Sequence, residues 1–179
     1  IRTYHIKFQI LSVKDGFISL QLSPPVPQFK KDRETQVDII AQGAKDLVYI
    51  DLVLSWDPKL LSLTEIIPGS FLTDEKGLPE VVSEVDPEKG TATIKLFKKQ
   101  AEGASGNGIL VSVKMSGLQK GVSYFRADQV NAKNSQLEAI AAKGFQSEAY
   151  VTLFLAGDVN GDGTVNMDDL IIFSRAFGS

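Results

Sequence analysis

Apolar and polar residues alternate along most of this chain, which predicts a protein built mainly of β-strands. The alternation runs through residues 1–13 and resumes over residues 18–22 after an Asp15-Gly16 turn. From Gln36 onward, short apolar runs follow one another and are separated by turns that contain Gly, Pro or Asp. The strands expected there span residues 37–41, 48–56, 60–66, 81–85, 91–97, 109–115, 124–130, 137–142 and 150–155.

Short strands with regular turns and few helical windows favour a mostly β fold, namely a β-sandwich of two sheets. Among such sandwiches we expect a jelly roll, because this topology hides the sheet edges best. Residues 24–27 contain three prolines and suit a sheet edge or a crossover. Gln42-Gly43 is expected to be a turn, and the glycine-rich residues 106–108 a mobile loop. The charge-rich residues 29–34 and 74–76 are expected to be solvated loops.

Near the C-terminus, oxygen-bearing residues recur at alternate positions in front of an apolar run. A calcium loop takes side-chain oxygens at its positions 1, 3 and 5, a backbone carbonyl at 7 and a carboxylate at 12. Gly163 falls at position 6, where the sharp turn favours a residue without Cβ. The sequence therefore predicts a Ca²⁺ site that ends in Asp in place of the usual Glu. The expected ligands are Asp158, Asn160, Asp162, Thr164, Asn166 and Asp169.

The alternative for this segment is a turn that binds no ion, since Asp, Asn and Gly form turns by themselves. Without an ion, three carboxylates would lie close together, so we expect calcium to order the loop. Asn166 can cap the helix that follows, and Gly178 ends it. That helix is apolar on more than one side and only about three turns long, so it must pack against another surface.

Composition limits the classes of function. The chain has 179 residues, of which 43% are apolar and 23% charged, as in an ordinary globular domain. The net charge of −3 gives no reason to expect a nucleic acid partner, and no apolar run is long enough for membrane insertion. The chain has no cysteine, no Gly-x-Ser-x-Gly motif and a single histidine, His5, on the polar side of residues 1–13. We therefore expect that it is not an enzyme.

The calcium loop also bears on the compartment. Outside cells calcium is at millimolar level, so that even weak sites with a Kd of about 10⁻⁴ to 10⁻³ M are filled. An extracellular or cell-surface location is therefore favoured.

Two groups of motifs resemble known families. The segment GDVNGDGTVNMDDLIIFSRAFG resembles a dockerin repeat, which is a calcium loop followed by one helix. LVYIDLVLSWDPKLLSLTEIIPGSF and ASGNGILVSVKM together resemble the cohesin domain, in which an aromatic-Asp-Pro turn is followed by Leu, Thr-Glu and Pro-Gly. The resemblance divides the chain into an N-terminal extension or extra strand (1–17), a cohesin-like β-sandwich (18–155), and a single dockerin-like calcium loop with a short C-terminal helix (156–179).

This resemblance implies a non-catalytic protein-recognition module, as in assemblies that degrade polysaccharide. It implies a protein partner of dockerin or cohesin type that is bound through one sheet face. Tyr49 and Asp51 fall on the strand that carries partner contacts in cohesins, and Lys95, Ser112 and Lys114 are expected on neighbouring strands.

Two other functions stay open. A carbohydrate-binding module would need coplanar exposed aromatic rings, for which Tyr49, Tyr124 and Phe97 are the candidates; Trp56 is expected in the core. The third possibility is a structural calcium clasp, in which residues 167–177 pack on the sandwich or drive self-association with the same helix of a second chain.

Overall fold

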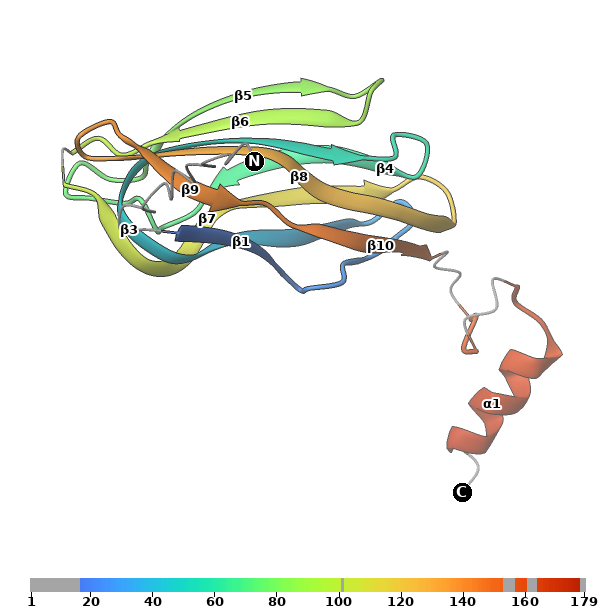
Figure 1. Cartoon of the computed structure of the whole chain (residues 1–179). Coiled ribbons are helices and arrows are strands. Elements are labelled where there is room, and N and C mark those ends of the chain that lie inside the picture. The colour runs from blue at the N-terminus through green and yellow to red at the C-terminus, as the bar shows by residue number, and fades with distance from the viewer. Residues whose placement is uncertain (1–16, 101, 153–156, 161–163, 178–179) are drawn as a thin grey trace, which may run out of the picture.

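The structure, a computed structural model, describes residues 17–100, 102–152, 157–160 and 164–177 (Figure 1). The N-terminal alternation and the Asp15-Gly16 turn therefore lie outside the described residues. The elements in chain order are β1 (Phe17–Ser23), β2 (Gln28–Lys30), β3 (Glu34–Trp56), β4 (Leu61–Pro68), β5 (Glu80–Asp86), β6 (Thr91–Phe97), β7 (Ala104–Gly117), β8 (Gly121–Asn134), β9 (Ala139–Lys143), β10 (Gln146–Thr152) and α1 (Met167–Phe177).

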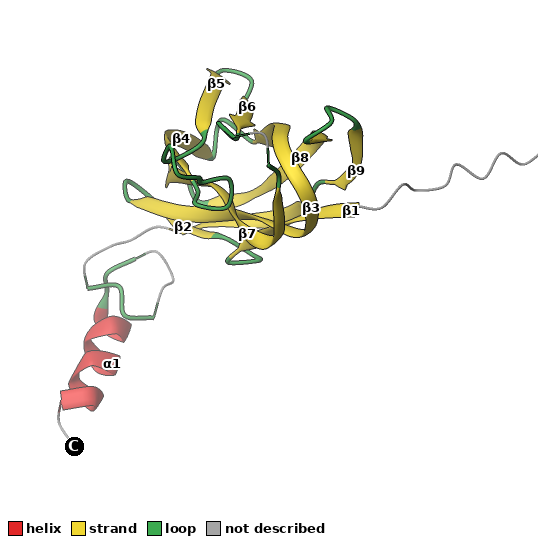
Figure 2. Ribbon diagram, turned by 90° about the vertical axis from the view of Figure 1, so that its left-hand side faces the viewer, coloured by secondary structure: helices red, strands yellow, loops and turns green. Residues whose placement is uncertain are grey.

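The strand β3 belongs to both layers of the fold. Its first part pairs with β1 over residues 38–42 and with β7 over residues 34–47. Its second part pairs with β6 over residues 49–55 and with β8 over residues 47–56. The first sheet is extended by β4, which pairs with β7, and the second by β5, which pairs with β6. The result is a jelly-roll β-sandwich, as the sequence predicts (Figure 2).

Further strands join the two layers. β9 pairs in parallel with β1 and antiparallel with β8, and so closes the sandwich along one side. β10 lies between β8 and β2; it pairs antiparallel with β8 and in parallel with β2. The proline-rich residues 24–27 form the crossover from β1 to β2, as expected from their missing backbone donors.

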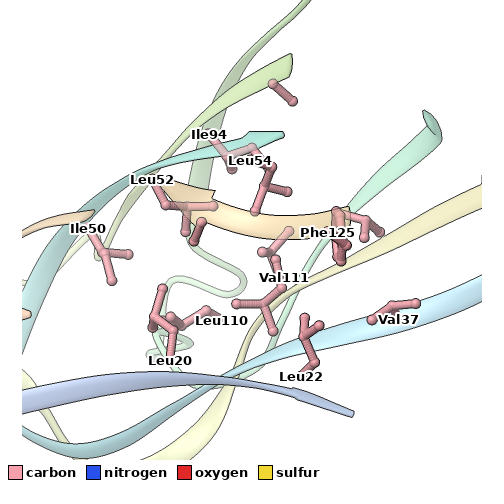
Figure 3. Close-up of a cluster of buried hydrophobic side chains, with 14 of the residues drawn as sticks. Leu20, Leu22, Val37, Ile50, Leu52, Leu54, Ile94, Leu110, Val111 and Phe125 are labelled. Atoms are coloured by element: carbon pink, nitrogen blue, oxygen red, sulfur yellow. The ribbon is translucent and has the colours of Figure 1, made fainter. Parts of the chain in front are cut away.

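The core lies between the layers and consists of inward-facing side chains from both sheets (Figure 3). Leu52 and Leu54 from β3 meet Ile94 from β6 and Phe125 from β8, while Leu20 approaches from β1 (Figure 3). Trp56 is only 1% exposed, and its ring nitrogen Nε1 donates to the carbonyl oxygen of Leu61 at 3.1 Å. The sequence prediction that Trp56 is a core residue is confirmed.

Two predicted irregular segments are instead parts of long strands. The turn predicted at Gln42-Gly43 is wrong, because β3 runs through these residues, and the mobile loop predicted at residues 106–108 lies within β7. The two segments face each other where the ladder shifts register, and the Gly43 amide donates to Asn107 Oδ1 at 2.7 Å. Gly43 has φ +71, so the glycine makes a bulge and does not end the strand.

The prediction of a solvated loop at residues 29–34 is wrong at its start. Phe29 is fully buried in β2, between Gln28 and Lys30, which are both exposed. A three-residue edge strand with one apolar side chain has too short a pattern to be recognised by its alternation. The predicted loop at residues 74–76 is confirmed as an exposed turn, closed by hydrogen bonds between Asp74 and Gly77.

The helix α1 begins where the sequence predicts. The amide of Asp168 donates to Asn166 Oδ1 at 2.7 Å, and the amide of Asn166 donates to Asp169 Oδ2 at 2.9 Å. These reciprocal bonds are a capping box, with Asn166 as the N-cap. In both views α1 lies apart from the strands (Figures 1 and 2).

Candidate functional site

The second sheet has an outward surface, here called the β3 face, made of the solvent-side residues of β5, β6, β8 and the second part of β3. Because Ile50, Leu52 and Leu54 point into the core, the alternate residues Tyr49, Asp51 and Val53 point outward. Lys95 on β6 lies directly opposite Asp51 in the ladder. Three of the residues predicted to contact a partner, Tyr49, Asp51 and Lys95, are thus brought together.

A carboxylate oxygen at the centre of this face has no hydrogen bond. Asp51 Oδ1 is buried and has no partner among the described residues. A buried acceptor that gives up water without gaining a donor destabilises the fold by about 1–3 kcal/mol. Asp51 is therefore suited to accept a hydrogen bond from a molecule that covers the face.

Aromatic rings lie beside Asp51. The rings of Tyr49 and Phe97 are 4.8 Å apart between centroids and tilted by 48°, and the Lys133 ammonium lies 5.7 Å from the Tyr49 centroid. Burial, followed by the negative charge of Asp51 and a side-chain hydrogen bond with Asp51, raises the pKa of Tyr49 above its ordinary value. Tyr49 therefore stays neutral near pH 7 and keeps its hydroxyl next to the Asp51 carboxylate.

A depression of about 560 Å³ lies at the Tyr49 end of the β3 face. Tyr49 and Phe97 line it together with residues from the segment after β6 and from the β8–β9 turn. Sequence reasoning missed this pocket, because only the topology brings Lys133 and the β8–β9 turn beside the lysines at the end of β6. The lysines that line it are Lys95, Lys98, Lys99 and Lys133.

The other two predicted contact residues, Ser112 and Lys114, lie on β7 in the first sheet and do not share the β3 face. Ser112 is 6% exposed, and its hydroxyl donates to Asp38 Oδ1 at 2.6 Å. Lys114 Nζ forms an ion pair with Glu65 Oε2 at 2.5 Å. The sequence placed Ser112 and Lys114 correctly on a strand next to β3. That strand, however, pairs with the first part of β3, whereas Tyr49 and Asp51 lie in its second part.

The opposite end of the β3 face carries a polar network. The Ser55 hydroxyl donates to Asp128 Oδ2 at 2.5 Å, and Arg126 Nε donates to Ser55 Oγ at 3.0 Å. The guanidinium of Arg126 also lies 4.5 Å from the ring centroid of Tyr124. The three rings named as carbohydrate candidates are therefore either tilted against each other or covered by a cation.

In the predicted calcium loop, the carboxylate of Asp169 accepts hydrogen bonds from three backbone amides. Asp169 is 2% exposed; its Oδ1 accepts from the amides of Val159 at 2.7 Å and Asn160 at 3.1 Å, in addition to the capping bond at Oδ2. The first and last described parts of the loop therefore meet at the carboxylate of Asp169.

The donor set is compatible with calcium, since every predicted ligand offers oxygen, the atom that calcium prefers. Asp162 lies outside the described residues. Among the residues that are described, no group of three or more Asp, Glu, His or Cys side chains could hold a metal ion. The Ca²⁺ site stays a prediction.

The helix of this segment leaves apolar side chains exposed. Met167, Leu170 and Phe173 are 66%, 57% and 52% exposed. The sequence indicates that this helix needs a packing surface, and α1 makes no extensive contact with a strand in the described part of the chain. No described helix is long and apolar enough to cross a membrane.

Comparisons with known proteins define the fold. The sequence matches no family model and no curated protein. The structure resembles a non-cellulosomal cohesin from the hyperthermophilic archaeon Archaeoglobus fulgidus, with a TM-score of 0.63 at 13% identity over 82% of this chain and 96% of that chain. It also resembles a chain of a type I cohesin–dockerin complex from Clostridium thermocellum, with a TM-score of 0.64 at 12% identity over 75% of this chain and 99% of that one.

A third similar structure is the cohesin module of a family 33 glycoside hydrolase from Clostridium perfringens, with a TM-score of 0.63 at 11% identity, over 78% of this chain and 98% of that chain. The chain therefore has a cohesin-like fold, which the sequence motifs in β3, β4 and β7 indicated.

Proposed function

We propose that this chain is a non-catalytic protein-recognition module that binds a dockerin-type protein through the β3 face. The observation that carries the proposal is the buried oxygen of Asp51, which has no partner among the described residues and lies at the centre of the β3 face beside the Tyr49 and Phe97 rings. Aromatic and polar groups around such a group are typical of protein interfaces. Several similar structures are cohesin–dockerin complexes, which supports a partner of this kind.

The experiment is a binding titration of the full chain against a panel of calcium-loaded dockerins, with one variant on each sheet. Val53→Arg places a charge in the middle of the β3 face, where Val53 lies between Thr93 and Gln129. Lys114→Glu changes the outward surface of the first sheet. We expect Val53→Arg to weaken binding at least about a hundredfold, because a buried unpaired charge is costly, and Lys114→Glu to leave it unchanged.

Two results would contradict this proposal. One is a chain that binds no member of the panel. The other is a Val53→Arg variant that binds as tightly as the parent chain while Lys114→Glu does not, which would move the interface to the sheet that carries Ser112 and Lys114.

We further propose that residues 158–169 bind Ca²⁺ and that the protein acts outside the cell or at its surface. The support is the closure of the loop on the Asp169 carboxylate, together with an all-oxygen set of predicted ligands. When bound, calcium would neutralise the loop carboxylates and stabilise the N-terminal end of α1.

The exposed apolar side of α1 supports a second role, self-association through residues 167–177. Met167, Leu170 and Phe173 form an exposed apolar surface of the kind that marks interaction sites. Sedimentation of the chain with calcium and with chelator tests this role. We expect association that Phe173→Asp removes; a chain that stays monomeric at high concentration would contradict it.

Carbohydrate recognition has less support. Sugar rings stack on exposed aromatic planes, whereas Tyr49 and Phe97 are tilted by 48° and the Tyr124 ring is covered by Arg126. Binding of the chain to insoluble cellulose with an affinity above that for the dockerin panel would favour carbohydrate recognition instead.

A further inference from the structure

We propose that the pocket at the Tyr49 end of the β3 face binds an acidic segment of the protein partner. This inference rests on the proposed function, since the pocket continues the face on which that partner would lie. The pocket, here called the lysine pocket, has the Tyr49 and Phe97 rings and the side chains of Lys95, Lys98, Lys99 and Lys133 along its walls. It lies at the end where β6 finishes and the β8–β9 turn begins (Figure 1).

The lysine pocket gathers four lysine side chains, against which one described carboxylate, Asp51, lies opposite Lys95 in the ladder. Lys95, Lys98, Lys99 and Lys133 form no ion pair with the described part of the chain, although the protein has a net charge of −3. Two lysines elsewhere in the described part of the chain form ion pairs, Lys89 with Asp86 at 2.7 Å and Lys114 with Glu65 at 2.5 Å. Gathering like charges at one end of a face raises the local positive potential and favours an anionic partner.

Two carboxylates, Asp46 and Asp74, hold the chain segments at the rim of the lysine pocket. Asp46 accepts hydrogen bonds from the amides of Gly103 at 3.0 Å and Ser135 at 3.2 Å, and Asp74 Oδ2 accepts from the amide of Gln100 at 2.9 Å. These bonds fix the segments that carry the lysines and the pocket rim. The backbone that carries the lysines is therefore already ordered before binding, which lowers the entropic cost of binding a partner.

The aromatic lining of the lysine pocket favours a protein segment over an acidic polysaccharide. The Tyr49 and Phe97 rings are tilted by 48° and give no flat platform for a sugar ring. Leu137, at the rim, is 69% exposed and offers an apolar contact. A segment in which Asp or Glu alternates with Leu or Phe would match both the lysines and the apolar lining of the pocket.

The test uses the full chain and two fluorescein-labelled, end-capped peptides. One has glutamates interspersed with leucine and phenylalanine, and the other has glutamine at every glutamate position. The pocket variant is Lys98→Glu with Lys99→Glu. Its matched control is Lys59→Glu with Lys120→Glu, which changes the charge equally at the opposite end of the sandwich, in the β3–β4 and β7–β8 turns. Circular dichroism and melting temperature check that each variant is folded.

We expect the glutamate peptide to bind and the glutamine peptide to bind at least about tenfold more weakly. The pocket variant should lose about tenfold or more of the affinity for the glutamate peptide, and the control variant should change it by less than about twofold. Added salt should weaken binding to the parent chain.

Equal binding of the two peptides, or a folded pocket variant with the affinity of the parent chain, would overturn the proposal. Binding of tetragalacturonate in preference to the glutamate peptide would also overturn it, because the ligand would then be an acidic carbohydrate. Failure here is separable from failure of the proposed function. Suppose that Val53→Arg removes binding of a dockerin, whereas the pocket variant binds the glutamate peptide, the glutamine peptide and that dockerin with the affinities of the parent chain. The proposed β3 face would then be supported, and the proposed role of the lysine pocket would be contradicted.

Discussion

Asp46 and Ser135 are 89 positions apart in the sequence, yet the Ser135 hydroxyl donates to Asp46 Oδ2 at 2.6 Å. The other oxygen, Oδ1, accepts from the Gly103 amide, and the Asp46 amide donates to Ser105 Oγ at 2.9 Å. One carboxylate in β3 thus ties the start of β7 to the β8–β9 turn. This arrangement fixes the end of the sandwich at which the lysine pocket lies.

The first prediction concerns the pH dependence of stability. The hydrogen bond from the Ser135 hydroxyl, supported by the amides of Ser135 and Gly103, lowers the pKa of Asp46 below its ordinary value. A lowered pKa in the folded state means that the stabilisation is present above the unfolded-state pKa, about 3.9, and is lost as the pH falls below it. Asp46→Asn should therefore lower the melting temperature at pH 7, and the difference from the parent chain should shrink toward pH 3.

The control for this prediction is Asp32→Asn. Asp32 also has a positive φ, 57°, beside 55° for Asp46, and asparagine tolerates that conformation. Asp32 is exposed and lies in the turn after β2. Melting curves from pH 3 to 7 in which the two variants behave alike would contradict the role given to the Asp46 carboxylate.

The second prediction tests the register of β3. Leu52 is fully buried, whereas its neighbour Val53 points outward and is half-buried. Leu52→Ala should reduce the free energy of unfolding by about 2–5 kcal/mol, because it leaves a cavity in the core. Val53→Ala should cost about 1 kcal/mol or less. Urea denaturation measures both, and a larger cost at Val53 would mean that the faces of the strand are exchanged.

The third prediction concerns a glycine that lies against the end of β3. Gly90 has φ +66, its carbonyl accepts from the Trp56 amide at 2.9 Å, and a Cβ at this position would collide with the Trp56 carbonyl oxygen. Gly77 also has a positive φ, +100, but faces open space. Gly90→Ala should therefore destabilise the chain by about 1–3 kcal/mol more than Gly77→Ala. Equal melting temperatures for the two variants would show that the collision is relieved without cost.

The fourth prediction concerns calcium. In isothermal titration we expect Ca²⁺ to bind with measurable heat and to increase the helical circular dichroism signal, since the ion would hold the loop against the start of α1. Asp169→Asn should lose this binding. Asp168→Asn is the matched control, because the neighbouring side chain is exposed and outside the predicted ligand set.

A parent chain that gives no heat with Ca²⁺ and keeps its spectrum in chelator would contradict the calcium site. Loss of binding in Asp168→Asn but not in Asp169→Asn would place the ligand set elsewhere in the loop.

Alternation alone predicted which side chains form the core and which form the β3 face, because a period of two separates the sides of a strand wherever one side is buried. Leu52, Leu54 and Trp56 were identified in this way, and Tyr49 and Asp51 followed on the other side. The cap at Asn166 was also predictable, since it depends only on neighbours in the sequence.

What the sequence did not reveal depends on long-range pairing. Gly43 has the composition of a turn, but β7 bends opposite it and keeps β3 continuous. Lys98 and Lys133 are ordinary surface lysines in the sequence and meet only because β6 and β8 both flank β3. Ser112 was expected on a strand next to β3, and β7 is such a strand, but the sequence did not reveal that β3 has a different set of neighbours in each layer.

The continuity of β3 has a consequence for how the domain comes apart. Since one uninterrupted segment supplies a strand to each layer, neither sheet can be dismantled while the other keeps its full complement of strands. We therefore expect denaturation of the sandwich to be a single cooperative event, in which fluorescence from Trp56, at the junction of β3 with its turn, reports the loss of both layers at once.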